Sequence, residues 1–336
     1  MKLFLAYILF FSSNLLFAQS SDDFFHKGNE YFDNQLFEQA IQQYSKAIEI
    51  DAKDLQALNN RALAHFKIKN YKASIADYTA LINLVPKSAD AYYNRANAYV
   101  ELKDFNKALN DYNESIKLNG NKSEFYFNRG NLYNIQQNYE LAKSDFDKVI
   151  ELNSKDAEAY NNRGMAKYKL KDFNGAIQDF SYAIKYQDDF FIYYKNRAMT
   201  YYAIDSFDIA IKDYNTSIQL NSKDHNSFQL RGNCKSQLKK YTEAIEDFNQ
   251  AISLNPNNAN ALNNRGLAFY ALGDYEKALS DYNLAIENAS EYGSAYANRA
   301  LVKFQLNQKE SACKDLDTAK KLGIEYAEEI AKSRCK

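Results

Sequence analysis

The chain has 336 residues, of which 46% are hydrophobic and 25% charged, a composition that excludes a disordered protein. Ten glycines and two prolines are too few for a turn-rich all-β fold or for a collagen-like or low-complexity chain. The formal charge of −1 provides no field that would gather nucleic acid or an anionic membrane. Three cysteines exclude a disulfide-rich scaffold, although they suffice for one bridge.

Residues 1–18 have the pattern of a secretory signal peptide. Lys2 precedes an unbroken apolar run over residues 3–11, and polar residues interrupt the sequence before Ala18, which suits a cleavage site. The run is shorter than the ~20 residues of a membrane span, although an uncleaved N-terminal anchor is the alternative. We therefore expect an exported protein, periplasmic or secreted, with no membrane span after cleavage and with residues 19–20 as a short N-terminal segment.

From residue 21 to residue 326 the sequence repeats itself every 34 residues, nine times and without insertion or deletion. Within each repeat, place 4 is aromatic or Leu, place 8 is Gly or Ala, place 20 is Ala or Ser, and place 24 is aromatic or Leu. Residues four apart share a helical face, so each repeat is predicted to be two helices that approach closely at the small residue. The repeats are 21–54, 55–88, 89–122, 123–156, 157–190, 191–224, 225–258, 259–292 and 293–326.

The ends of the predicted helices carry their own signals. Polar residues at place 16 are expected to cap the second helix of a repeat. A last segment, 325–336, is predicted to be a capping helix and tail, because Ala327, Ile330 and Ala331 give it an apolar stripe. The expected N-caps are Asn70, Asp104, Asn138, Asp172, Ser206 and Asp274.

This pattern resembles the tetratricopeptide repeat family, because nine in-phase copies satisfy several of its places. Tryptophan is absent, with Tyr or Phe usually in its place, and the proline of the closing turn survives only as Pro86 and Pro256. The resemblance implies an all-α fold, a right-handed α-solenoid of nine helix–turn–helix repeats whose first helices line a concave groove. It also implies a non-catalytic scaffold or adaptor that binds an extended peptide or protein partner in that groove. A carbohydrate-binding protein and a purely structural spacer of the cell envelope are the alternatives.

The family geometry assigns candidate binding residues to the concave face. Place 6 is Asn in seven repeats, and this row resembles the asparagine ladder that holds peptide backbones in O-linked sugar transferases. The alternative is that each asparagine bridges neighbouring helices. An apolar patch in the fifth and sixth repeats could accept apolar partner groups, or could pack between repeats. The row is Asn60, Asn94, Asn128, Asn162, Asn196, Asn264 and Asn298, and the patch is Met165, Tyr168, Ile192, Met199 and Tyr202.

A charged pair recurs along the chain. Place 7 is Arg and place 23 is Asp in the same eight repeats, starting with Arg61 and Asp77. The equal numbers favour ion pairs between helices, within a repeat or to the next one. The alternative is a row of arginines that faces an anionic ligand.

The cysteines indicate one disulfide, and nothing indicates catalysis. Cys313 and Cys335 lie ten residues before and twelve after Gly323, so a chain reversal there would bring them level on antiparallel helices. This ending is similar to those of other exported bacterial tetratricopeptide proteins, and we predict a bridge in an oxidising compartment, the alternative being two small apolar fillers. No catalytic motif, metal-ligand spacing or nucleotide-binding loop occurs, so we expect no enzyme activity, no cofactor and no metal. The sequence does not indicate the oligomeric state.

Overall fold

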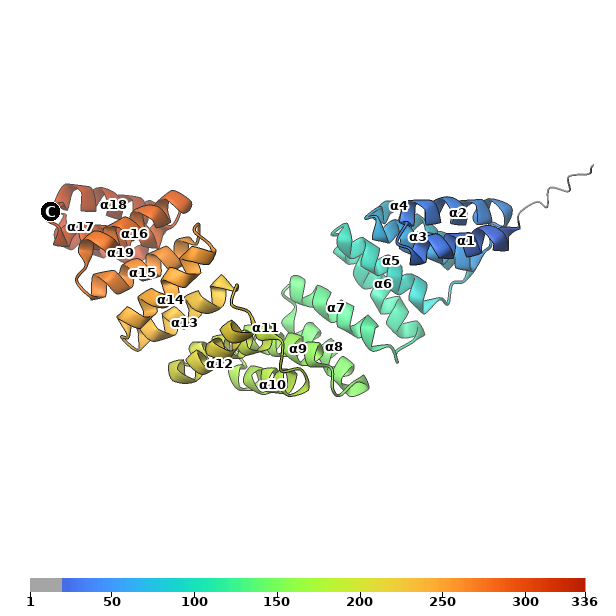
Figure 1. Ribbon diagram of the computed structural model, residues 1–336, viewed down its shortest axis with the longest axis horizontal. Helices are drawn as coiled ribbons and strands as arrows, with labels where there is room; N and C mark the ends of the chain where they lie inside the picture. The colour runs from blue at the N-terminus through green and yellow to red at the C-terminus, as the bar shows by residue number, and fades with distance from the viewer. Residues whose placement is uncertain (1–19, 336) are drawn as a thin grey trace, which may run out of the picture. The chain divides into compact units, whose positions relative to one another are not determined.

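The computed structural model describes residues 20–335, so the predicted signal peptide and Gln19 lie outside the described residues. Over this range the chain forms 19 α-helices and no strand. Consecutive helices run antiparallel to one another and follow the chain in order (Figure 1). The predicted all-α solenoid class is confirmed.

The helices alternate in length with the sequence period. The first helix of each repeat has 13 residues, and the second helix has 14 residues in the first eight repeats. The helices are α1 Ser21–Asp33, α2 Phe37–Ile50, α3 Leu55–Lys67, α4 Tyr71–Leu84, α5 Ala89–Glu101, α6 Phe105–Leu118, α7 Ser123–Ile135, α8 Tyr139–Leu152, α9 Ala157–Lys169, α10 Phe173–Tyr186, α11 Phe191–Ala203, α12 Phe207–Leu220, α13 His225–Gln237, α14 Tyr241–Leu254, α15 Ala259–Ala271, α16 Tyr275–Asn288, α17 Gly293–Gln305, α18 Lys309–Lys321 and α19 Glu325–Arg334.

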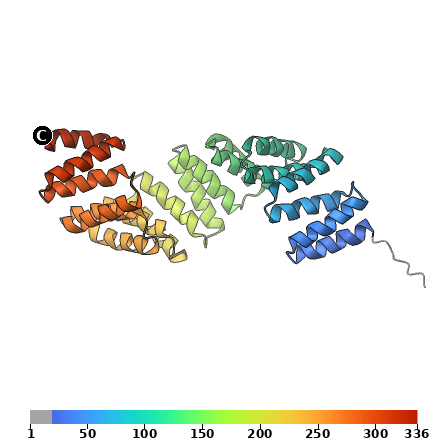
Figure 2. The ribbon, with the colours of Figure 1, turned by 90° about the horizontal axis from the view of Figure 1, so that it is seen from above.

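The chain divides between Leu132 and Tyr133, inside α7, into two compact blocks. In the first block α1 pairs with α2, α3 with α4 and α5 with α6, and in the second block the pairs run from α9–α10 to α17–α18. Second helices also pack against the next first helix, as α2 does on α3 in the first block and α14 on α15 in the second. Figure 2 shows the same succession from above. One hairpin cannot bury its apolar faces alone, so each block is stabilised by stacking of neighbours.

The core of a repeat is a large side chain packed on a small residue. The rings of Tyr44, Phe180 and Phe248 are fully buried at place 24. A Cβ atom added to Gly164 at place 8 would lie 2.8 Å from Cε1 of Phe180, closer than carbon atoms approach without a shift. The prediction that a small residue at place 8 permits the close approach of the two helices is confirmed.

The turn inside each repeat contains one residue in the left-handed conformation, at place 15. It is glycine only at Gly273 (φ 82°), and the other repeats use residues with a Cβ atom at this strained position. The N-cap follows at place 16, where Asn70, Asp104, Asp172 and Asp274 accept a hydrogen bond from a first-turn N–H as predicted. Asn138 and Ser206 occupy N-cap positions but make no side-chain cap hydrogen bond. The other left-handed residues are Gln35, Lys69, Lys103, Gln137, Lys171, Asp205, Lys239 and Asn307.

The last helix, α19, covers the end of the second block. With a period of 34 residues, another repeat would begin at residue 327, but α19 begins at Glu325. The helix begins early because α18 has 13 residues and is followed by a short turn through Gly323. Ala327 is fully buried, and Ile330 packs on the same cluster, which is the predicted apolar stripe. A disulfide joins Cys313 on α18 to Cys335 at the end of α19, with 5.8 Å between their Cα atoms.

Candidate functional site

The recurring Arg–Asp pairs link helices rather than facing outward. Arg95 on α5 donates from Nε and Nη2 to both carboxylate oxygens of Asp111 on α6, at 2.7 and 2.8 Å. Its third donor, Nη1, reaches Thr79 on the second helix of the preceding repeat at 3.0 Å. The hydrogen bond to Asp111 is the main cause of the raised pKa of Arg95. The same bidentate geometry holds for Arg61–Asp77, Arg163–Asp179, Arg197–Asp213, Arg231–Asp247, Arg265–Asp281 and Arg299–Asp315.

This geometry confirms the interpretation as ion pairs and specifies that they lie within a repeat. Guanidinium groups in which each of the three nitrogens binds a protein acceptor are directed at those acceptors rather than at an anionic ligand. In three repeats a lysine at place 11 adds a second cation to the same aspartate. These pairs are Lys167–Asp179, Lys235–Asp247 and Lys303–Asp315.

The asparagine row is part of the contact between successive first helices. The amide of Asn264 donates to Oδ1 of Asn233, at place 9 of the preceding repeat (2.8 Å), and the amide of Asn298 donates to Asn263, at place 5 (2.9 Å). Asn60, Asn128 and Asn196 donate in the same way to residues of the preceding repeat. Asn162 accepts from Asn161, whereas Asn94 makes no side-chain hydrogen bond within residues 20–335. These bonds are the ones expected of a bridge between neighbouring helices. In Asn60, Asn162 and Asn264 the carbonyl oxygen also accepts from the asparagine that precedes it.

A second recurring contact lies where the two helices of a repeat meet. An aromatic residue at place 12 packs its ring against the aromatic ring at place 17, as Tyr202 does on Phe207 at 5.4 Å. The pair fixes the ring at place 12 against the start of the second helix. The same contact occurs in Phe32–Phe37, Phe66–Tyr71, Tyr168–Phe173 and Tyr270–Tyr275.

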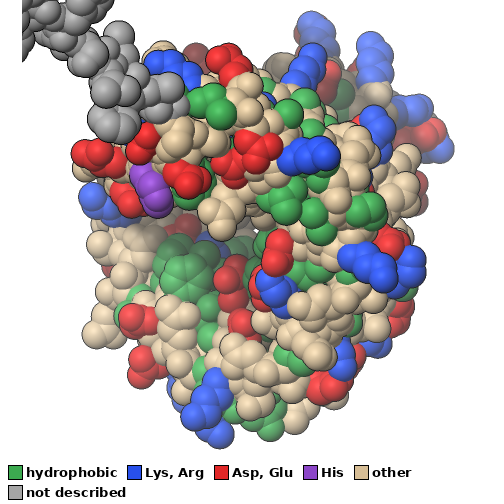
Figure 3. Space-filling model, turned by 90° about the vertical axis from the view of Figure 1, so that its right-hand side faces the viewer, with side chains coloured by type: hydrophobic (Ala, Val, Ile, Leu, Met, Phe, Trp, Pro, Cys, Tyr) green, Lys and Arg blue, Asp and Glu red, His purple; other side chains and the backbone are tan. Residues whose placement is uncertain are grey.

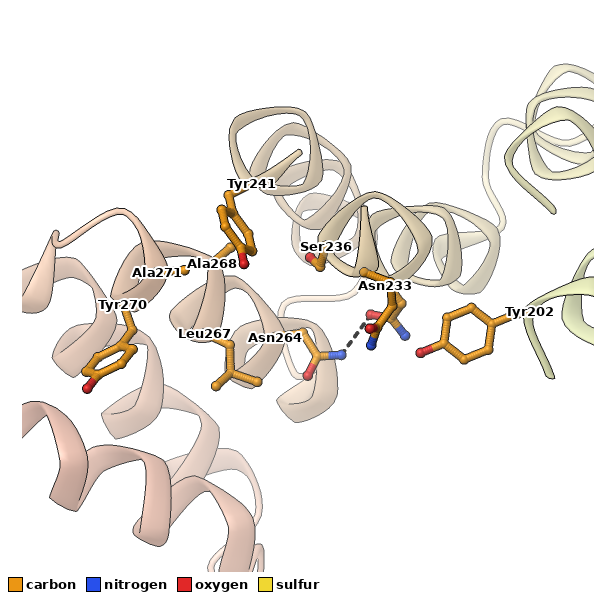
Figure 4. A pocket seen from close by; sticks show the side chains of 10 residues that line it. Tyr202, Asn233, Ser236, Tyr241, Asn264, Leu267, Ala268, Tyr270 and Ala271 are labelled. Carbon is orange, nitrogen blue, oxygen red and sulfur yellow. Dashed lines mark hydrogen bonds between the residues drawn. The ribbon is translucent and has the colours of Figure 1, made fainter. Parts of the chain in front are cut away.

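The seventh repeat lacks this aromatic pair, and a cavity lies in its place. Ser236 stands at place 12, so the ring of Tyr241 at place 17 has no aromatic partner there. The cavity has a volume of about 420 Å³ and is open to the surface. Figure 4 shows that side chains from α11, α13 and α15 converge on it. We name it the tyrosine–amide cavity, and it is lined by Tyr202, Asn233, Ser236, Gln237, Tyr241, Asn264, Leu267, Ala268, Tyr270 and Ala271.

The lining of the tyrosine–amide cavity is uncharged, polar and aromatic. The hydroxyl oxygen of Ser236 is buried and has no hydrogen-bond partner within the described residues. Leu267 is 42% exposed beside it, and the Asn264–Asn233 hydrogen bond crosses between the two helices (Figure 4). Such a surface offers hydrogen bonds and apolar contacts but no ionic partner, so it suits an uncharged group.

Two of the predicted binding residues, Tyr202 and Asn264, line the tyrosine–amide cavity. Asn162 and Ile192 line a second cavity of about 460 Å³ beside α9 and α11. Tyr168, Met165 and Met199 are partly buried and line neither cavity. The two cavities therefore contain four of the twelve predicted residues, two in each.

Sequence reasoning missed most of the tyrosine–amide cavity, including Ser236, Leu267 and Tyr270. A signal was nevertheless present, because place 12 is aromatic in the repeats on either side of Ser236. A small residue at a place that is aromatic in six of the nine repeats indicates a void beside the ring at place 17.

Acidic and basic side chains are interspersed over the face of the molecule in Figure 3. Within residues 20–335, no group of His, Cys, Asp or Glu side chains could hold a metal ion. Over the same residues, no helix combines the length and the apolar character required to cross a bilayer.

Family models match most of the repeats. A model described as a TPR repeat matches residues 28–69 and 232–273. Two models described as tetratricopeptide repeats match residues 89–122, 123–156 and 259–292, and residues 55–88 and 157–190. No curated protein matches the chain.

Solved structures with the same architecture include a tetratricopeptide repeat protein from Parabacteroides merdae. It is 25% identical, with a TM-score of 0.56 over 75% of this chain and 100% of that one. The C-terminal part of a TPR repeat-containing protein from Cytophaga hutchinsonii is 17% identical, with a TM-score of 0.61 over 71% of this chain and 98% of that one. The APC/C Cut9–Hcn1 structure is 15% identical, with a TM-score of 0.59 over 94% of this chain and 76% of that one. The chain therefore belongs to the tetratricopeptide repeat family.

Proposed function

We propose that the chain is a non-catalytic scaffold whose first helices bind an extended segment of a protein partner, with one side chain in the tyrosine–amide cavity. Its family supports a protein-interaction scaffold. The observation that carries the finer proposal is the cavity itself, which three successive first helices build at the surface.

The lining matches the chemistry of a peptide segment. Leu267 and the tyrosine rings offer apolar contact to an uncharged side chain, and tyrosine is among the residues enriched where the binding energy of protein interfaces is concentrated. The side-chain amide of Gln237 can both accept from and donate to the main chain of a partner segment.

The substitution Ser236→Tyr tests this proposal, because it restores the aromatic pair that five other repeats contain. Filling the void is expected to raise the melting temperature, since cavity-filling changes commonly stabilise by about 0.5–2 kcal/mol. The same change is expected to weaken, by at least about tenfold, the binding of peptides selected from a random-peptide display library, because their side chain is displaced. Fluorescence anisotropy measures the affinity.

The matched control is Val100→Tyr, which adds the same ring at place 12 of the third repeat, outside the cavity. This variant is expected to bind the selected peptides as the wild type does. Peptides that bind Ser236→Tyr with unchanged affinity would exclude the cavity as their site. If the peptide library yields no binder while a glycan array yields ligands, the carbohydrate-binding alternative is favoured. An amide- and tyrosine-lined cavity also suits a sugar.

We also propose that the chain is exported to the periplasm or the medium. The N-terminal apolar segment supports this, and so does the Cys313–Cys335 disulfide, because such bridges persist in oxidising compartments. Cell fractionation with mass spectrometry of the purified chain is expected to find Gln19 at the N-terminus outside the cytoplasm. A chain that retains Met1 in the cytoplasm would contradict export.

A further inference from the structure

The turn between α10 and α11 differs from most of the turns that lead into a first helix. Six turns that lead into a first helix contain a hydrogen bond from the N–H of place 34 to the carbonyl of place 31, as from Asp224 to Asn221. Two turns, from Asn119 to Lys122 and from Gln187 to Phe190, lack this bond within the described residues. The backbone of the turn between α10 and α11 is therefore not held in the geometry that the repeat otherwise imposes.

Phe190 stands at the N-cap position, where other repeats have a side chain that can cap the helix. At place 34, Ser88 and Asp156 accept a hydrogen bond from a first-turn N–H of their helices. Phe190 makes no such bond, so α11 begins without the stabilisation that an N-cap provides. Tyr292 stands at the same place before α17 and likewise makes no side-chain cap bond, so an uncapped start is shared by two first helices. A departure from the local pattern of the repeat is what is expected at a functional position.

The unusual residues of this turn line the cavity of about 460 Å³ beside α9 and α11. Phe190 is 38% exposed, and its ring meets that of Tyr193 in an edge contact at 5.0 Å. Glu158, in the first turn of α9, is the charged residue of the lining. The other lining residues are Asn161, Asn162, Gln187 and Ile192.

The field inside this cavity is negative. Burial, and after it the charges of nearby carboxylates, raises the pKa of the Tyr193 hydroxyl to about 12, and these carboxylates are Glu158, Asp156 and Asp189. Partial loss of hydration, followed by the charge of Asp156, also raises the pKa of Glu158. No cation is among the causes of either shift.

Lysine side chains near the turn do not neutralise this cavity. Lys195 on α11 donates to Asp224 at 3.2 Å, and Lys185 on α10 lies over the rings of Tyr182 and Tyr186. Glu158 forms no ion pair within residues 20–335.

We propose that this cavity binds a lysine or arginine side chain of the partner segment, with the cation between the carboxylate of Glu158 and the ring of Phe190. A carboxylate supplies the ionic hydrogen bond and an exposed aromatic face attracts a cation, so the two together select a basic side chain over an uncharged one. This inference rests on the proposed function and specifies the charge of its partner.

The test uses peptides selected from the random-peptide display library with the disulfide-bonded chain. Each Lys or Arg of a selected peptide is replaced by Gln, and affinities are measured by fluorescence anisotropy. We expect one replacement to weaken binding to the wild type by about tenfold, and to have little effect on binding to Glu158→Gln, which has lost the ionic partner. Glu246→Gln on α14 is the matched control, because it removes an exposed carboxylate outside both cavities, and it is expected to keep the tenfold effect.

A second variant, at Phe190, separates a binding role from a purely structural one, because the two roles predict different changes in melting temperature and in peptide binding. Phe190→Ser restores the kind of cap that Ser88 provides, so we expect a higher melting temperature together with weaker binding of the basic peptides. A lower melting temperature with unchanged binding would show that Phe190 serves only the packing of the turn.

The outcomes separate this inference from the proposed function. Selected peptides whose affinity depends on Ser236 but not on any basic residue would overturn the cation site and leave the proposed function standing. A tenfold effect that persists in Glu158→Gln would also overturn it. A library that yields no binding peptide would overturn both.

Discussion

At the scale of single residues, the tyrosines at place 24 differ in whether the buried hydroxyl has a partner. The Tyr112 hydroxyl donates to Oδ1 of Asn97, which stands at place 9 of the same repeat, at 2.6 Å. The hydroxyls of Tyr78 and Tyr214 are buried without a hydrogen-bond partner within the described residues. In the repeat of Tyr78, place 9 is Leu63, which offers no acceptor. A tyrosine at place 24 therefore contributes a hydrogen bond in some repeats and an unsatisfied buried hydroxyl in others.

Substitution by phenylalanine is expected to reveal this difference. Tyr112→Phe removes a buried hydrogen bond and is expected to lower the free energy of unfolding by about 1 kcal/mol. Tyr78→Phe and Tyr214→Phe remove an unsatisfied buried group and are expected to be neutral or stabilising. Urea denaturation of the three variants measures the changes, and an equal loss in all three would contradict the assigned hydrogen bonding.

His65 provides a pH dependence. Its Nδ1 atom is buried without a partner within residues 20–335, and burial lowers the pKa of the imidazole, opposed by Asp77 and assisted by Arg61. The unfolded chain, with a histidine pKa of about 6.5, then binds the proton more tightly than the folded chain does. The stability that neutral His65 contributes is present above this value and is lost as the pH falls below it.

We expect the free energy of unfolding of the wild type to fall more steeply below pH 6.5 than that of His65→Phe. Phenylalanine is a suitable replacement, because Phe269 stands at the same place of another repeat. Denaturation curves across this pH range measure both proteins. Parallel pH profiles would show that His65 does not titrate differently in the folded state.

At the scale of the elements, the arginines connect three helices. Arg95 on α5 binds Asp111 on α6 and Thr79 on α4, so it joins the two helices of one repeat to the preceding repeat. Asp111 is 6% exposed, which makes it costly to leave unpaired.

A double-mutant cycle tests this connection. Arg95→Ala is expected to lower the free energy of unfolding by about 3 kcal/mol, because it leaves the carboxylate of Asp111 buried and unpaired. Arg95→Ala with Asp111→Ala is expected to cost less than the sum of the two single changes. The exposed pair Lys117–Glu114 is the control and is expected to show a coupling below about 1 kcal/mol. Additive losses at Arg95 and Asp111 would contradict the ion pair.

The disulfide fastens α19 to α18. Cys313 and Cys335 are 22 residues apart, and closing a loop of this length stabilises by about 3 kcal/mol in the chain-entropy model. We expect Cys335→Ser to increase hydrogen exchange in α19 while exchange in α9 to α16 is unchanged, since repeats contact only their neighbours. Cys234→Ala is the control, because this thiol is buried and unbridged. Uniform loss of protection along the chain would contradict local fastening.

Much of the helical pattern could be predicted because each place recurs through the repeats and averages out local exceptions. The left-handed residue at place 15 could not, because lysine, glutamine, aspartate or asparagine occupies it everywhere except at Gly273. The partners of the asparagine row could not either, because each bond of Asn264 or Asn298 joins two repeats, and the period does not specify how repeats stack. The tyrosine–amide cavity arises from Ser236, a departure from the repeat, whereas the prediction relied on what the repeats share.

At the scale of the whole molecule, the described chain is two blocks of stacked hairpins in which the core of each repeat is similar. Because the cores are similar, function is expected at places where the repeats differ. In the second block, Ser236 and Phe190 are two such places, and each lines a cavity. Ser236 leaves a cavity beside the ring of Tyr241, and Phe190 leaves the start of α11 without a side-chain cap. A residue that lowers the stability of the fold is expected at a position where binding, rather than folding, determines which residue is present.

The most direct measurement of this account is site-specific photocrosslinking in the cells that make the protein. A photoreactive phenylalanine analogue is placed at Leu267, which is exposed in the tyrosine–amide cavity, and for comparison at Glu246 on α14. We predict a protease-sensitive adduct at Leu267 that is absent at Glu246 and is lost when Ser236→Tyr fills the cavity. An adduct at Leu267 that persists in Ser236→Tyr, or the same adduct at both positions, would contradict the cavity as the binding site.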